Sequence, residues 1–148
     1  MEENRKRSHS VYELHVHIAW STKYRYGVLR GDVQLRCRDL IRQVCDSMDI
    51  RIMKGLVSKD HVHLHLSYPP KLSVSEIVKR LKGRSARLLL DEFSELKRRY
   101  WGQYLWGIGY GSWSSGNITD EMIQKYLDHH RDNPNSIRIL FLNDFNEL

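Results

Sequence analysis

The chain has 148 residues, and 24 Lys and Arg against 18 Asp and Glu give it a formal net charge of +6. We expect one domain over residues 1–148, with residues 1–8 as a mobile tail. The absence of a long apolar run and of a secretory signal excludes a membrane protein, and two cysteines exclude a disulfide framework, so we expect a cytoplasmic protein without a membrane partner.

The first half of the chain predicts a strand, a helix and two more strands. Residues 11–21 are rich in Val, Ile, Tyr and Trp, which is typical of a strand. Apolar residues recur at helical spacing over 32–48, and Asp32 is the expected N-cap. Two further strands are predicted at 50–57 and 61–68, joined by a short turn and ended by two prolines.

The second half predicts a helix, a strand and a last helix. Ser73 and Glu76 form a capping box, and Thr119 caps a helix that runs to about residue 131. Strands are predicted at 104–113 and, shorter, at 136–142. The order strand-helix-strand-strand-helix-strand is that of the ferredoxin-like (RRM-like) α+β fold, a four-stranded antiparallel sheet with helices on one face, here followed by a C-terminal helix.

Positive charge is concentrated between Lys71 and Trp101, where nine basic residues accompany four acidic ones. Flat aromatic residues follow directly, at Tyr100, Trp101 and Tyr104. Positive charge beside aromatic rings suits a phosphate backbone with stackable bases. The alternative is a solvated basic helix face beside a few core aromatics.

Three histidines alternate along the predicted strand 61–68. Alternate residues of a strand share a face, so His61, His63 and His65 point the same way. Buried imidazoles without partners are costly, so these side chains are exposed, hydrogen-bonded or bound to a ligand. A His-apolar-His pair can hold one divalent ion. His15 and His17 have the same spacing, and an ordinary solvated sheet face is the alternative for both groups.

The last helix places Met122, Tyr126 and His130 on one face, because they are four residues apart. Tyr126 fits the edge of a helical core, as most tyrosines at this spacing do. With His130 one turn later, it can also present its oxygen to whatever a metal ion polarises.

These residues together resemble the single-tyrosine HUH transposases. The motif His61-Val62-His63 follows Asp60, and further matching segments cover residues 10–133. Those segments are His17-Ile18-Ala19-Trp20, Thr22-Lys23-Tyr24-Arg25, Ser67-Tyr68-Pro69-Pro70, Ser75–Gly83, Glu92-Phe93, Trp101-Gly102, Leu105–Tyr110 and Tyr126. The family comprises the transposase A enzymes of small insertion sequences, in the IS two-hundred and six-hundred-and-five group.

The resemblance implies a DNA transposase that cuts and rejoins single-stranded DNA at hairpin-bearing element ends. Tyr126 is then the nucleophile of a covalent 5′-phosphotyrosine intermediate, and His61 and His63 bind Mg²⁺ or Mn²⁺. The third metal ligand of the family is Gln four residues after the tyrosine, where this chain has His130. His65 also departs from the family, which has an apolar residue there. The family further implies a homodimer.

The basic segment is where we expect contacts with the DNA backbone. The candidate residues are Lys79, Arg80, Lys82, Arg84, Arg87, Lys97, Arg98 and Arg99. The alternative function is a non-catalytic or host-domesticated nucleic-acid-binding homologue of the same fold, in which the histidines are ordinary surface residues.

Overall fold

Four antiparallel strands form the central sheet in the order β4-β5-β3-β6. The computed structural model describes residues 6–7, 10–11, 14–114 and 117–132, and the side chains of 14–114 and 117–129. Its elements are β1 (Lys6–Arg7), β2 (Ser10–Val11), β3 (Leu14–Ser21), a 3₁₀ helix (Lys23–Arg25), α1 (Gly31–Ser47), β4 (Arg51–Val57), β5 (His61–Tyr68), α2 (Val74–Glu92), α3 (Ser94–Arg99), β6 (Gly111–Trp113) and α4 (Asp120–Asp132). This strand order confirms the predicted ferredoxin-like fold.

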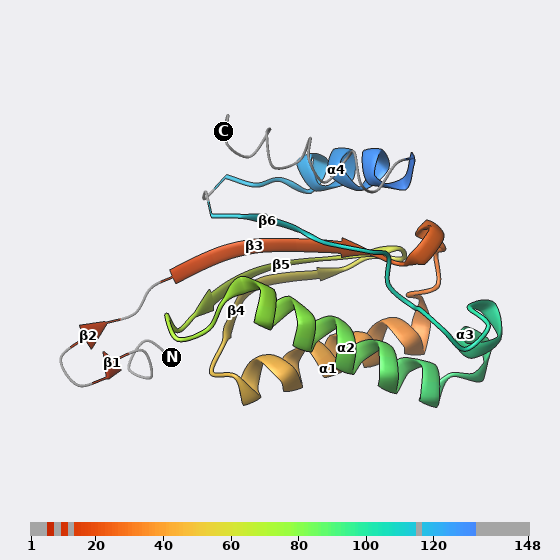
Figure 1. Ribbon diagram of the computed structural model, residues 1–148, viewed down its shortest axis with the longest axis horizontal. Helices are drawn as coiled ribbons and strands as arrows, with labels where there is room; N and C mark the ends of the chain where they lie inside the picture. Colours follow the sequence, from red (N-terminus) through yellow and green to blue (C-terminus); the bar gives the residue numbers. More distant parts are fainter. Residues whose placement is uncertain (1–5, 8–9, 12–13, 115–116, 133–148) are drawn as a thin grey trace.

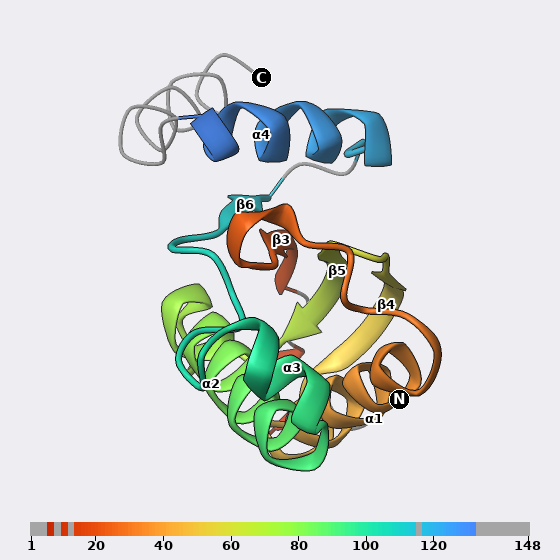
Figure 2. The same cartoon turned by 90° about the vertical axis from the view of Figure 1, so that its right-hand side faces the viewer.

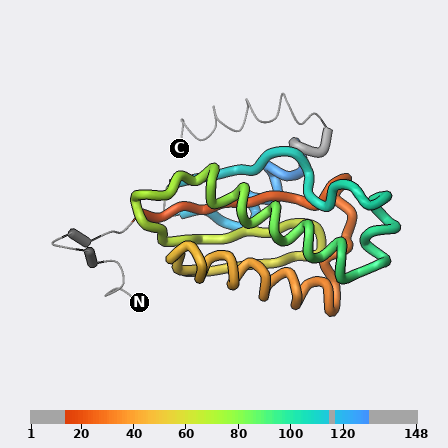
Figure 3. Tube along the Cα trace, turned by 60° about the horizontal axis from the view of Figure 1, so that its bottom comes forward, coloured from red at the N-terminus to blue at the C-terminus, as the bar shows by residue number. Residues whose placement is uncertain are grey.

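The two faces of the sheet are covered by different helices. Helices α1 and α2 run side by side on one face, and α4 lies over β6 and β3 on the other (Figures 1, 2 and 3). Ile18 and Trp20 of β3 point to the α1–α2 layer and belong to the large hydrophobic core. Ala19 points the other way and packs with Trp113 and residues of α4 in a second cluster.

Pairing between β3 and β5 gathers the histidines on the α4 side. His17 is opposite His65, Ala19 is opposite His63, and Ser21 is opposite His61. Because side chains alternate between faces, these residues form one surface, which we call the histidine face. The alternation seen in the sequence is therefore confirmed.

The helix starts agree with the sequence in two cases and differ in one. The Ser73 hydroxyl accepts a hydrogen bond from the Glu76 amide at 3.2 Å, as a capping box requires. Thr119 Oγ1 accepts from the Met122 amide at 3.3 Å. Helix α1 begins at Gly31, so Asp32 lies inside its first turn and is not the N-cap.

The expected strand at 104–113 was wrong for most of its length. Only Gly111–Trp113 is a strand, and Trp106 makes an isolated bridge to Thr22. The Lys82 ammonium donates to the carbonyls of Gly107 and Gly109 at 2.8 and 2.9 Å, so a side chain replaces a strand as their partner.

Some features of the remaining chain differ from expectation or lie beyond what the structure describes. Helix α3 was not predicted from the sequence. The short hairpin of β1 and β2 includes part of the predicted tail, and the predicted strand at 136–142 lies outside the described residues. Within the described part of the chain, every helix is too short or too polar to cross a bilayer.

Candidate active site on the histidine face

His61 is fully buried at the start of β5 and is held by a carboxylate. Its Nδ1 donates to Asp60 Oδ1 at 2.9 Å. Burial alone would raise the pKa of Asp60, but the hydrogen bond from His61 and the charge of Arg25 hold that pKa below its usual value. The carboxylate oxygen accepts the Nδ1 proton, so Nε2 is the nitrogen that remains for another partner.

That second nitrogen faces another carboxylate, from the first turn of α4. His61 Nε2 lies 3.4 Å from Asp120 Oδ1. A lone pair against a carboxylate is unfavourable unless a proton or a cation lies between them. A proton or a divalent cation would satisfy this pair, and Asp60 orients the imidazole for either one.

His63 belongs to a row of neighbouring imidazoles. Its Nε2 lies 3.3 Å from His17 Nδ1, and the ring of His17 stacks on that of His65 at 4.1 Å. Burial, and then the neighbours His65, His63 and His15, lower the pKa of His17 to about 4. Burial also lowers the pKa of His63, while the carboxylate of Asp120 opposes that shift. Both shifts favour the neutral imidazole, which is the form that binds a metal ion.

Tyr126 lies at the interface between α4 and the histidine face. It is 7% exposed and packs with Ala19, the β3 residue paired with His63. Its ring meets that of Trp113 edge to face, with centroids 5.9 Å apart and planes at 89°. The predicted nucleophile therefore comes from the helix that covers the predicted metal ligands.

The third predicted ligand, His130, is in α4, but its side chain is outside the described part of the chain. Among the described side chains, no group of three His, Cys, Asp or Glu is arranged to hold a metal ion. Possible ligand atoms lie close together in pairs at this site: His61 Nε2 with Asp120 Oδ1, and His63 Nε2 with His17 Nδ1.

Arg25 links α4 to the histidine strand. Its guanidinium contacts Asp60 Oδ2 at 3.0 Å, Asp128 Oδ1 at 3.1 Å and Gln124 Oε1 at 3.2 Å. Sequence reasoning placed Arg25 in a matching segment without a role, and it did not single out Asp120 as a site residue. No local signal pairs either residue with His61.

The predicted DNA-binding residues are divided between two places. Four of them line a hollow of about 520 Å³ between α1 and α2: Lys79, Arg80, Arg84 and Arg87. These two helices cover the face of the sheet opposite α4 (Figure 2). Lys97 and Arg98 are exposed on α3. Arg99 stacks on Tyr26 at 4.0 Å, and Lys82 binds the two glycine carbonyls.

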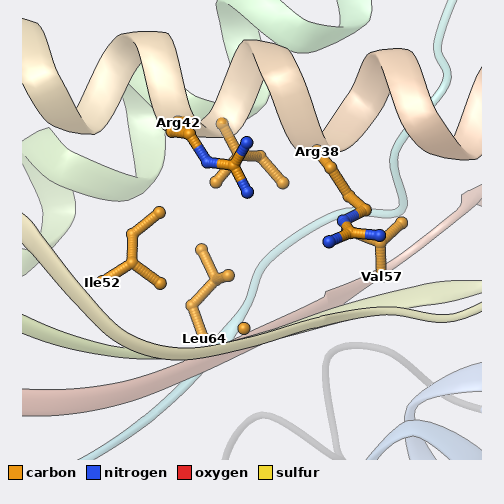
Figure 4. Close-up of a pocket in the computed structure, with 7 residues that line it drawn as sticks. Arg38, Arg42, Ile52, Val57 and Leu64 are labelled. Carbon is orange, nitrogen blue, oxygen red and sulfur yellow. The ribbon is translucent and has the colours of Figure 1, made fainter.

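A second cavity, of about 220 Å³, opens between α1 and the edge strand β4. Arg38 and Arg42 reach over a floor that includes Ile52, Val57 and Leu64 (Figure 4). Its two arginines lie on the same side of the sheet as α1 and α2, and the sheet separates them from the histidine face.

Comparison with known sequences identifies the class of protein. Residues 10–130 match the family described as "Transposase IS200 like". The ISDra2 transposase TnpA of Deinococcus radiodurans is 36% identical over 122 residues, which cover 82% of this chain and 87% of that protein. The transposase for insertion sequence element IS200 of Salmonella typhimurium is 31% identical over 129 residues, covering 87% and 84%. The chain belongs to the IS200-like transposase family.

Solved structures agree with this assignment. A crystal structure of a proposed transposase from Deinococcus radiodurans is 34% identical, with a TM-score of 0.76, over 84% of this chain and 95% of that one. A REP-associated tyrosine transposase, solved bound to a REP hairpin, is 13% identical, with a TM-score of 0.54, over 80% and 66%. The second likeness is one of fold. Together these findings confirm the prediction of a DNA transposase.

Proposed function

We propose that this transposase cuts and rejoins single-stranded DNA at hairpin-bearing element ends, with Tyr126 as the nucleophile. The observation that carries the proposal is the packing of α4, which brings Tyr126 and the histidine strand to one face of the sheet. Tyr126 shares a buried cluster with Ala19, the residue paired with His63, while Asp120 of the same helix lies 3.4 Å from His61.

The reaction is a transesterification. The Tyr126 oxygen bonds to the scissile phosphorus, the bond from phosphorus to the 3′ oxygen breaks, and the products are a 5′-phosphotyrosine and a free 3′-OH. The phenol proton leaves with the attack, and the departing 3′ oxygen takes up a proton. Because one phosphoester replaces another, rejoining needs no ATP.

His61 and His63, with His130, are the proposed ligands of Mg²⁺ or Mn²⁺. They would hold the ion beside the scissile phosphate, where it would supply positive charge against the charge that develops there. Asp60 keeps the His61 proton on Nδ1, so that Nε2 stays available as a ligand. Three imidazoles favour softer metals than Mg²⁺, whereas the Asp120 carboxylate beside them suits Mg²⁺ and Mn²⁺.

Two surfaces of the molecule support the proposed DNA substrate and the proposed partner chain. Lys79, Arg80, Arg84 and Arg87 are proposed to hold the phosphates of the hairpin stem in the basic hollow. Lys97, Arg98 and Arg99 are further proposed backbone contacts, whereas the two carbonyl bonds of Lys82 favour a structural role for it. The proposed homodimer has a candidate surface at the edge strand β4, where Met53 and Leu56 are 44% and 41% exposed. The hairpin-bound relative is a precedent within the fold.

The test is a denaturing gel with a 3′-end-labelled single strand that carries a hairpin. Wild-type protein with Mn²⁺ is expected to give a slow-migrating covalent species, and Tyr126→Phe is expected to abolish it. Tyr110→Phe, which removes a hydroxyl elsewhere, should keep it. EDTA added before the strand should prevent the covalent species from forming, and so should His61→Ala.

Absence of a covalent species with every hairpin strand would reject this function. The family resemblance would then describe a DNA-binding homologue without cleavage, in which Tyr126→Phe leaves DNA affinity unchanged. A covalent species that survives Tyr126→Phe would reject Tyr126 as the nucleophile.

A further inference from the structure

Two exposed tyrosines flank one lysine beside the histidine face. Tyr24 is 66% exposed and Tyr104 is 64% exposed. The ammonium of Lys23 lies 5.4 Å from the ring centroid of Tyr24 and 5.2 Å from that of Tyr104. We call Lys23, Tyr24 and Tyr104 the aromatic platform. Large aromatic surface left in water around a single cation is a feature of binding sites.

The backbone under the platform is fixed from several directions. The Thr22 amide donates to the Asp60 carbonyl at 2.9 Å, and the Lys23 amide donates to the Leu105 carbonyl at 2.8 Å. The Tyr100 hydroxyl donates to the Lys23 carbonyl at 3.2 Å. A surface held in place loses little entropy when a ligand binds.

Tyr24 itself is in a conformation that an L-residue adopts at a cost. Its φ is 63°, in the left-handed region. That region costs a side chain about 1–2 kcal/mol. The cost is not offset by burial of the ring, which is exposed. Strained residues of this kind gather at functional sites.

The platform adjoins the candidate active site through one residue. Arg25 follows Tyr24 directly, and its side chain contacts Asp60 and the α4 residues Gln124 and Asp128. The turn therefore presents an aromatic ring to solvent at one position and a guanidinium to the histidine strand at the next. Asp60, which Arg25 contacts, is also the residue that holds His61.

We infer that the aromatic platform binds unpaired bases of the single strand on its way to or from the histidine face. The ring faces of unpaired bases stack on tyrosine, and Lys23 supplies charge for an adjacent phosphate. Paired bases in a duplex have no free ring face to offer. The inference rests on the proposed single-strand substrate and names the surface that takes its bases.

The experiment measures binding in the Tyr126→Phe chain, so that cleavage plays no part. The probe is a labelled oligo-dT strand, followed by fluorescence anisotropy. Tyr24→Asn removes one ring and suits the left-handed conformation, and Tyr104→Ala removes the other. Each is expected to weaken binding about 5- to 150-fold, while Tyr24→Phe and Tyr104→Phe stay within about twofold. Leu35→Ala, at another exposed apolar residue, is the matched control.

Two further readouts separate stacking from charge and from damage to the fold. Tyr24→Asn should leave the slope of log affinity against log salt unchanged, and Lys23→Gln should lower it by about one contact. A 2-aminopurine base in the strand should be quenched on binding, and less so with Tyr104→Ala. Affinity for a duplex should not change with either tyrosine variant.

The outcomes distinguish this inference from the proposed function. Platform-dependent strand binding without a covalent species in the wild-type chain would support the platform and reject the cleavage. A wild-type covalent species, with unchanged strand binding by both tyrosine variants, would overturn the platform. Equal losses for strand and duplex would also overturn it, because bases would then not be what the rings contact.

Discussion

Arg25 donates from Nη1 to the carboxylate of Asp128 across 3.1 Å, although 103 residues separate the two in the chain. The same guanidinium contacts Asp60 and Gln124. Asp60 in turn holds His61, and His61 meets Asp120 at the start of α4. The contacts therefore form a closed ring that joins the tyrosine helix to the histidine strand.

Removing Arg25 is expected to loosen α4 and to slow the reaction more than it weakens DNA binding. Arg25→Ala leaves the Asp60 carboxylate largely buried without its cation, which costs about 3–5 kcal/mol. Hydrogen exchange should show faster exchange in α4, and kcat for adduct formation should fall at least about tenfold with KM for the strand nearly unchanged. Arg25→Lys, which keeps the positive charge, should show a smaller loss than Arg25→Ala.

Arg36→Ala is the matched control, because it removes a bidentate Arg–carboxylate pair, to Glu92, that lies at the surface. A surface pair of this kind contributes little to stability. If Arg25→Ala leaves exchange in α4 unchanged, the ring of contacts does not hold the helix. A rise in kcat would show that it holds the helix in an unproductive position.

His17 makes the fold sensitive to acid. Its pKa is about 4 when folded, mainly because of burial, and 6.5 is the ordinary value. Between these values the unfolded chain binds the proton and the folded chain does not. The free energy of unfolding is therefore unaffected by His17 above pH 6.5 and falls as the pH drops to 4. Between pH 6.5 and 5 this loss is up to about 2 kcal/mol. Urea unfolding in EDTA should show a smaller loss for His17→Gln, and an equal loss would contradict the assignment.

Two basic residues of α2 should behave in opposite ways. Lys82→Met breaks the bonds to Gly107 and Gly109 and should reduce the free energy of unfolding by about 2 kcal/mol, with DNA affinity unchanged in the folded protein. Arg84→Gln, in the open hollow, should leave stability within about 0.5 kcal/mol. It should lower the salt slope of hairpin binding by about one contact. Thermal unfolding and filter binding measure the two effects. Weaker DNA binding for Lys82→Met, with lower stability for Arg84→Gln, would contradict a structural role for Lys82 and a DNA-binding role for Arg84.

Trp113 is expected to control the docking of α4. Trp113→Ala removes the ring that meets Tyr126 edge to face and the largest side chain of the small cluster with Ala19, Ile123 and Leu127. Losing a buried Trp costs about 3–5 kcal/mol. Amide exchange should rise in α4 and stay slow in α1, while Trp113→Phe should show a smaller effect. Uniform acceleration in both helices would instead show global destabilisation.

The sheet and the histidine face could be predicted because they depend on local spacing. Alternation along β5 placed His61 and His63 on one face without any knowledge of their neighbours. The contact of His61 with Asp120 could not be predicted in this way, since it requires α4 to dock 59 residues later in the chain.

The failures have physical causes that lie outside the segments concerned. Residues 104–113 have the aromatic composition of a strand, but Gly109 adopts a φ of 83° and Lys82 takes the neighbouring carbonyls. Helix α3 is six residues long, too short for a helical period to be visible in the sequence. The basic residues were adjacent in sequence, but folding divided them between the far side of the sheet and its end.

The sheet acts as a partition between the basic hollow and Tyr126. A DNA molecule with its stem in the hollow and its cut at Tyr126 must turn around one edge of the sheet. Helix α4 covers β6 (Figure 1), and β4, the edge proposed above for the partner chain, carries an irregularity between Ile52 and Lys54. Under the proposed function, the width of the sheet would therefore set the least number of unpaired nucleotides between the hairpin and the cleavage site.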